Sequence, residues 1–267
     1  MSSMKARWQI ASLVVVAVAT IVVIVESPSN EPVYHGKRLS YWFRQYAQQT
    51  PQMSEATNAF VHLGGQAVPY LVRVLERPIG PWQRAYNFAW GLLPKSQSKK
   101  LTLPNWRDGA RYYALEALAL IGPQAQKAVP AILRLLNDKD LELRRAAPLA
   151  LGQLRPLATN VIAALVNALT NGDWYTEENM VRALGAIGPA ATNAIPALVI
   201  ELNHFHPDFR TFAAEALGNL GSGAKAATPA LLTAMQDQHS QVREAARSAI
   251  LKIDAAWAMS VPPSRRR

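Results

Sequence analysis

A short repeat, which recurs without interruption, constrains the fold of this chain more than any other feature of its sequence. When the sequence is written in rows of 33, one column holds only alanine and its neighbour holds leucine or isoleucine. The alanine column is Ala117, Ala150, Ala183, Ala216 and Ala249, and the next column is Leu118, Leu151, Leu184, Leu217 and Ile250. Five rows keep this register without a gap, which is typical of a repeat architecture.

Each row predicts two short amphipathic helices, because apolar residues recur at i, i+3, i+4 and i+7. The first helix, as in "LRRAAPLALGQL", is rich in small residues that let a neighbouring helix approach closely. Glycine follows this helix in three rows, where a left-handed C-cap favours it: Gly122, Gly188 and Gly221. Proline lies near the start of the second helix, where its missing N–H is tolerated, at Pro130, Pro196 and Pro229.

One such helix pair cannot bury its own apolar face, but stacked pairs form a continuous core. The sequence therefore predicts an all-α fold, an α-solenoid of about five to six helix pairs, preceded by an N-terminal transmembrane helix. We expect regular repeats over residues 111–256 and a degenerate first repeat with a basic insertion over 55–110. Residues 31–54 are expected to be a linker and a short helix, and residues 257–267 a disordered basic tail.

The N-terminal segment, residues 1–30, predicts a membrane anchor. Lys5 and Arg7 precede an apolar run over residues 8–25, which as a helix would span about 27 Å of a hydrocarbon core roughly 30 Å thick. A cleaved signal peptide and a buried core helix are the alternatives. The triplet Ala17-Val18-Ala19 lies inside the run, and no good cleavage site follows it, which favours the uncleaved anchor.

The positive-inside rule places Lys5 and Arg7 in the cytoplasm. We therefore expect the repeat domain outside it, on the periplasmic or extracellular side. Lys37, Arg38 and Arg44 follow the apolar segment and keep the reverse orientation open.

The net charge of +10 is concentrated outside the repeats. Residues 73–111 hold eight basic residues against two acidic ones, whereas residues 112–255 hold twelve basic and thirteen acidic residues. A solenoid that binds nucleic acid should repeat Lys or Arg along one face, so nucleic acid is disfavoured as a partner. Lys95, Lys99 and Lys100 in the insertion could instead bind an anionic lipid or envelope polymer, or form a merely solvated loop.

Three segments resemble HEAT repeats, especially the short bacterial HEAT-like units first described in phycobilisome lyases: "VREAARSAILKI", "LRRAAPLALGQL" and "RALGAIGPAATNAIPALV". The resemblance covers roughly residues 55–255 and is strongest from Arg111. It implies a right-handed superhelix of helix pairs whose concave face binds other proteins. The repeat motif carries no catalytic residue, and no part of the chain marks a bilin pocket, so no cofactor is expected.

The most regular polar feature is a column of arginines, with Glu177 in place of the third: Arg111, Arg144, Arg210 and Arg243. These cations could bind acidic ligands. The interpretation we favour is a structural ladder, in which each arginine bonds to acidic or carbonyl groups in adjoining turns.

Other candidate sites are sparse. His204 and His206 could bind a metal if Asp208 joined them, but histidines in turns are more often without such a role, and we expect no metal. The segment "DWYTEEN" groups three carboxylates, which can do acid–base work but also favour a helix N-terminus. Trp174, Tyr175 and Glu177 in this segment are candidate partner-binding residues.

The sequence contains no recognisable motif for nucleophilic catalysis or phosphate binding. There is no cysteine, so disulfides and thiol catalysis are excluded. No G-x-S-x-G or phosphate-loop motif occurs. We therefore expect a non-catalytic, membrane-anchored scaffold that binds a protein partner of unknown identity and oligomeric state. The alternatives are an enzyme or accessory subunit of the lyase-associated class, and a binder of anionic lipid or polymer through the basic insertion.

Overall fold

The computed structural model describes residues 31–76, 109–155, 159–169 and 173–254. Within these ranges every element is a helix except one short hairpin. The chain divides into two compact units, Met1–Ala114 and Leu115–Arg267. The expected membrane segment (8–25), most of the insertion (77–108) and the tail (257–267) lie outside the described residues.

The described part of the first unit begins with a hairpin where a linker was expected. β1 (Val33–Tyr34) pairs antiparallel with β2 (Lys37–Arg38). The turn between them has positive φ at both His35 (47°) and Gly36 (70°), as a type I′ turn requires. The Nε1 of Trp42, in the helix that follows, donates to the Tyr34 carbonyl at 2.9 Å and ties the hairpin to it. The prediction of an all-α chain was therefore wrong for residues 33–38.

Three helices follow the hairpin in the first unit: α2 (Leu39–Ala47), α3 (Met53–Leu63) and α4 (Val68–Glu76). A 3-10 turn, η1 (Gly64–Gln66), joins the last two. Gly64 has φ 49° and ψ −125°, a conformation that only glycine adopts without strain. The pair α3–α4 corresponds to the degenerate first repeat.

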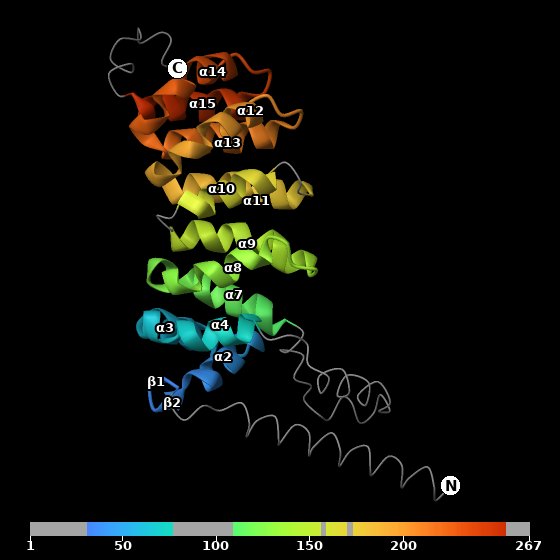
Figure 1. The fold of residues 1–267 in the computed structure, drawn as a ribbon. Helices are drawn as coiled ribbons and strands as arrows, with labels where there is room; N and C mark the ends of the chain where they lie inside the picture. Colours follow the sequence, from blue (N-terminus) through green and yellow to red (C-terminus); the bar gives the residue numbers. More distant parts are fainter. Residues whose placement is uncertain (1–30, 77–108, 156–158, 170–172, 255–267) are drawn as a thin grey trace, which may run out of the picture. The chain divides into compact units, whose positions relative to one another are not determined.

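The second unit repeats a long first helix and a short second helix, stacked in the order of the sequence (Figure 1). The first helices are α7 (Ala110–Ile121, which begins in the first unit), α9 (Leu141–Leu154), α11 (Trp174–Ile187), α13 (Pro207–Asn219) and α15 (Ser240–Ile253). The second helices are α8 (Val129–Leu135), α10 (Thr159–Leu169), α12 (Ile195–Glu201) and α14 (Thr228–Ala234). The predicted helix pairs and their register are confirmed here.

The connections within three pairs are 3-10 helices instead of irregular loops: η3 (Gly122–Ala128), η4 (Gly188–Ala194) and η5 (Gly221–Ala227). Each opens at a glycine with positive φ, between 65° and 75°. The predicted left-handed cap is only partly correct, since Gly188 has ψ −141°, outside the left-handed helical region. Proline is the second residue of the helix that follows each connection, as predicted.

Small residues set the distance between consecutive first helices. The alanine and leucine columns are buried throughout. A Cβ added at Gly152, Gly185 or Gly218 would lie 3.0, 2.9 or 2.8 Å from the Cα of an alanine on the next first helix. These glycines therefore hold α9, α11, α13 and α15 at close spacing, which fixes where the side chains of neighbouring repeats meet.

One helical stretch of the described chain, Trp174–Glu201, is long and apolar enough to cross a membrane. It consists of α11, η4 and α12, and 44% of its most apolar window is buried. The core of a helix pair accounts for this composition. Residues 8–25 are outside the range that this observation covers.

Candidate functional site

The arginine column makes the same backbone contacts in three repeats. In each, Nη1 donates to the carbonyls six and five residues earlier: Arg144 to Asp138 and Lys139, Arg210 to His204 and Phe205, and Arg243 to Asp237 and Gln238. In the first unit, the Nε of Arg111 donates to the Leu75 carbonyl at 2.9 Å. A guanidinium in this column therefore ties the start of a first helix to the turn before it.

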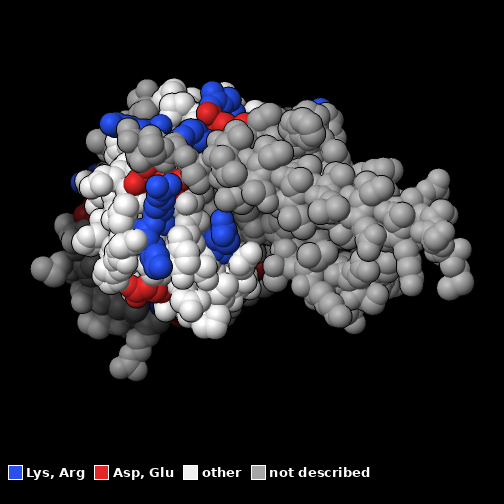
Figure 2. Space-filling model, turned by 90° about the horizontal axis from the view of Figure 1, so that it is seen from below, with Lys and Arg blue, Asp and Glu red and all other residues white. Residues whose placement is uncertain are grey.

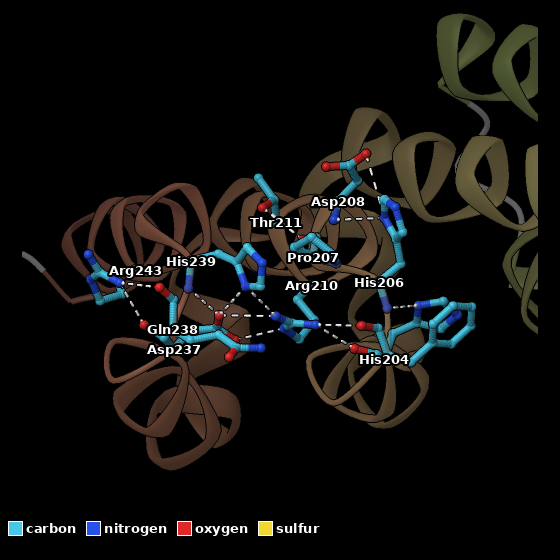
Figure 3. A network of polar contacts seen from close by, with 11 residues as sticks. His204, His206, Pro207, Asp208, Arg210, Thr211, Asp237, Gln238, His239 and Arg243 are labelled. Atoms are coloured by element: carbon cyan, nitrogen blue, oxygen red, sulfur yellow. Dashed lines mark hydrogen bonds and ion pairs between the residues drawn. The ribbon is translucent and has the colours of Figure 1, made fainter.

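Arg210 also joins two repeats (Figure 3). Its Nε and Nη2 donate to the two carboxylate oxygens of Asp237 at 2.7 and 3.0 Å, and Nη2 lies 3.1 Å from His239 Nδ1. The hydrogen bonds from Arg210 lower the pKa of Asp237 to about 2. Both side chains are largely buried, at 9% and 13% exposed.

The two histidines proposed as metal ligands lie in the turn before α13. Nδ1 of His204 accepts the His206 N–H at 3.1 Å, and Nδ1 of His206 accepts the Asp208 N–H at 3.3 Å. The His204 ring stacks on Phe209 with centroids 4.1 Å apart, and burial lowers its pKa. Among the described residues, no group of three or more His, Asp or Glu side chains could hold a metal ion.

The three carboxylates of "DWYTEEN" have different surroundings. Asp173 accepts hydrogen bonds from the Thr176 hydroxyl at 2.7 Å and from Arg145 Nε at 3.1 Å. Burial raises the pKa of Asp173, but these bonds outweigh it and leave the pKa below its ordinary value. Glu178 pairs with Arg182 one turn later, at 3.2 Å. Glu177 has no ion pair among the described residues.

The pKa values of Glu177 and of Glu201, a residue that our sequence analysis missed, are both raised. Burial and the Asp173 charge raise the pKa of Glu177, and burial and the Glu177 charge raise the pKa of Glu201. Glu201 also lacks an ion pair within the described ranges. The other repeats have Leu135, Ala168 and Ala234 in its column. A carboxylate in a column that is otherwise apolar was a signal in the sequence that could have identified Glu201.

Trp174 and Tyr175, predicted as one contact edge, point to different repeats. Trp174 packs against the turn before α13, with ring centroids 4.4 Å from His206, 4.8 Å from Phe209 and 5.8 Å from Phe205. Tyr175 instead lies under the guanidinium of Arg145 on α9, at 4.7 Å. Successive residues of a helix point about 100° apart. Trp174 therefore contacts the following repeat, whereas Tyr175 contacts the preceding one.

The same repeat carries the most exposed apolar side chains of the second unit. Tyr175, Ile200 and Phe205 are 59%, 70% and 80% exposed, whereas other large apolar residues described there are at most 42% exposed. In other repeats the matching positions are polar: Glu142 and Asp208 for Tyr175, Arg134 and Thr233 for Ile200, and Lys139 and Gln238 for Phe205. Ile200 and Phe205 were not among the predicted partner-binding residues.

The predicted basic candidates, Lys95, Lys99 and Lys100, lie outside the described residues. On the described part of the face in Figure 2, Lys and Arg side chains lie among uncharged residues, with acidic side chains near some of them. The described candidate residues belong to the repeat of α11 and α12, where the rings of Trp174 and Phe205 are in contact.

Sequence comparison identifies the repeat. A family model described as HEAT repeats matches residues 101–162 and 162–251, more than half of the chain. The chain belongs to the HEAT-repeat family. The resemblance inferred from the repeat columns is thereby confirmed. No curated protein sequence matches this HEAT-repeat chain.

Several solved structures resemble this HEAT-repeat protein. The CpcE–CpcF complex of phycocyanin lyase from Nostoc sp. PCC7120 is 23% identical, with TM-score 0.47, over 88% of this chain and 85% of that one. A designed armadillo repeat protein in complex with the peptide (KR)4 is 16% identical, with TM-score 0.49, over 70% and 99%. An engineered protein is 23% identical, with TM-score 0.47, over 80% and 96%. The family assignment rests on the sequence match alone.

Proposed function

We propose that this HEAT-repeat chain is a non-catalytic scaffold that binds a protein partner through the repeat of α11 and α12. The observation that carries the proposal is the exposure of Tyr175, Ile200 and Phe205 in one repeat. A single exposed apolar side chain is ordinary, but three in one repeat, at positions that are polar in other repeats, favour an interaction site. Aromatic side chains are also enriched among the residues that dominate binding energy.

The remaining polar groups of this region support a scaffold over an enzyme. Asp173 is held by Thr176 and Arg145, and Asp237 by Arg210. The Nδ1 atoms of His204 and His206 accept backbone N–H groups. Each of these interactions closes a turn or joins two repeats, so these side chains serve the fold.

The proposal includes an anchor: residues 8–25 hold the protein in a membrane and the repeats lie outside the cytoplasm. Lys5 and Arg7 before the apolar run support this orientation. A reporter enzyme that is active only outside the cytoplasm, fused after Arg267, should be active. An active fusion of a reporter restricted to the cytoplasm would contradict the orientation.

The test of partner binding is site-specific photo-crosslinking of the full chain in its native cell. A photoreactive amino acid at Phe205 should give a discrete protein adduct. The control is the same amino acid at Leu251, a residue 42% exposed on α15, where we expect no such adduct. Equal adducts at both positions, or none at Phe205, would refute partner binding through this repeat.

A further inference from the structure

Two side-chain acceptors close the turn before α9. Oδ1 of Asp138 accepts the N–H of Asp140, and Oδ1 of Asp140 accepts the N–H of Glu142, each at 3.0 Å. Asp140 thereby caps the N-terminus of α9. A carboxylate is ionised above about pH 4, so these acceptors do not change near neutral pH.

Two repeats later, imidazoles make the same bonds in the turn before α13. His204 and His206 occupy the columns of Asp138 and Asp140. Nδ1 of His204 accepts the His206 N–H at 3.1 Å, and Nδ1 of His206 accepts the Asp208 N–H at 3.3 Å (Figure 3). Neither ring belongs to a metal-binding group among the described residues. A protonated imidazole donates from both nitrogens and accepts at neither, so protonation removes both acceptors in the pH range where histidine ordinarily titrates.

The charged groups on α13 oppose protonation of His204 and act in both directions on His206. Burial, followed by the charges of His206 and Arg210, lowers the pKa of His204. A protonated His206 would lie 3.6 Å from the Asp208 carboxylate, but at the N-terminus of α13, where positive charge is unfavourable. The contribution of neutral His204 to the folded state is therefore present above about pH 6.5 and is lost as the pH falls below it.

Neighbouring elements hold this turn by its rings and its backbone. From α11, the indole of Trp174 lies against the His206 ring, with centroids 4.4 Å apart. Titratable groups also come from the end of α12, where a carbonyl accepts the His204 N–H, and from the turn before α15, where two side chains face Arg210: Glu201, Asp237 and His239. Phe205 is 80% exposed and lies between the two histidines in the chain, so its position depends on both Nδ1 bonds.

We propose that the turn from His204 to Asp208 is a pH-sensitive switch, in which protonation of its histidines opens the turn, displaces Phe205 and releases a partner held by this repeat. The release of a partner rests on the proposed function, whereas the opening of the turn does not. We expect no such transition in the turn before α9, where aspartates make the same bonds.

The test follows the fluorine resonance of 4-fluorophenylalanine placed at Phe205, in the full-length protein in detergent, from about pH 7.5 to pH 5. The resonance should shift with a midpoint at or below about pH 6.5. The variant His204→Asp/His206→Asp reproduces the acceptors of the turn before α9 and should abolish the shift. His204→Asn/His206→Asn is the second variant in case the aspartates do not fold, because an amide oxygen also accepts independently of pH.

His239→Gln is the matched control. His239 precedes α15 as His206 precedes α13, but its Nδ1 lies against Arg210 Nη2 and not against a backbone N–H, so the shift should remain. A wild-type resonance that does not move over this range would overturn the inference. A shift that persists in a folded double variant, or one that His239→Gln abolishes, would also overturn it.

The crosslink at Phe205 tests the link to the partner separately, on isolated membranes at both ends of this pH range. The adduct should form at pH 7.5 and be lost at pH 5 in the wild-type protein, and should persist at pH 5 in the aspartate variant. An adduct that the wild-type protein retains at pH 5 would overturn the release of the partner. If no adduct forms at either pH, the scaffold proposal fails, whereas the fluorine resonance still decides whether the turn opens.

Discussion

The pair between Arg210 and Asp237 allows a loss of stability to be worked out from the structure. Arg210→Met keeps much of the side-chain volume but removes every donor. The Asp237 carboxylate, 13% exposed, loses two hydrogen bonds, and the carbonyls of His204 and Phe205 lose one each. Breaking a buried ion pair by removing one partner costs about 3–5 kcal/mol. Because water reaches part of this site, we expect the free energy of unfolding to fall by about 3 kcal/mol.

Arg243→Met is the matched control. Arg243 lies in the same column and donates to two carbonyls in the same way, at 2.7 and 3.0 Å, but makes no ion pair among the described residues. Two such bonds contribute about 1–2 kcal/mol together. The difference between the two variants therefore isolates the contribution of the carboxylate.

The assay is urea unfolding of the full-length protein followed by far-UV circular dichroism. Nuclear magnetic resonance of the Asp237 carboxyl supplies a second readout, since its pKa should rise from about 2 toward the ordinary value of 3.8 when Arg210 is removed. Equal losses of stability in both variants, or an unchanged pKa of Asp237, would show that the ion pair does not join the two repeats as described.

Three further changes test other parts of the structure. The pKa of Asp237 is lowered to about 2 in the folded protein, so its contribution to the free energy of unfolding is present above pH 4 and is lost as the pH falls toward 2. The free energy of unfolding of the wild-type protein should therefore fall by about 1–2 kcal/mol over this range, and Asp237→Asn should abolish that pH dependence. The pKa of Glu177 is raised by burial and by the Asp173 charge, so its negative charge destabilises the folded state. Glu177→Gln should therefore leave the melting temperature at pH 7 unchanged or higher, and a marked drop would contradict this unfavourable effect of the charge. Gly218→Ala would place a Cβ 2.8 Å from the Cα of Ala249 and should lower the free energy of unfolding by about 1–3 kcal/mol despite its better helix propensity; a stabilised variant would show that α13 and α15 are less closely packed.

The helix pairs could be predicted from the sequence because a repeat tests each inference several times. An apolar pattern in one row is ambiguous, but the same pattern in five rows fixes which face of each helix is buried. The buried column from Ala117 to Ala249 follows directly from it. The 3-10 connections could not be predicted, since "GPQAQKA" contains turn residues that are compatible with several short conformations. The hairpin at His35-Gly36 is equally local and carried no repeat to support it.

The candidate site was only partly predictable for a different reason. Glu177 is conspicuous because it interrupts a column of arginines, and it was identified on that basis. Glu201 lies at the end of the second helix of the pair, and the effect of the Glu177 charge on its pKa depends on the folded arrangement, which the columns do not give. Phe205 appeared in the sequence only as the residue between two histidines. The exposure of Phe205 depends on the conformation of the turn between α12 and α13. The 33-residue repeat predicts which helix faces are buried but not the conformation of this turn.

The central claim is that the repeat of α11 and α12 differs from its neighbours for binding and not for folding. A single variant tests it by replacing five residues with those of other rows: Tyr175→Glu, Glu177→Arg, Ile200→Thr, Glu201→Ala and Phe205→Gln. The decisive measurement is the amount of partner that co-purifies with this variant from its native cell, alongside its unfolding midpoint. We predict an equal or higher midpoint and loss of the partner. Undiminished partner with an intact fold, or a variant that no longer folds, would contradict the account.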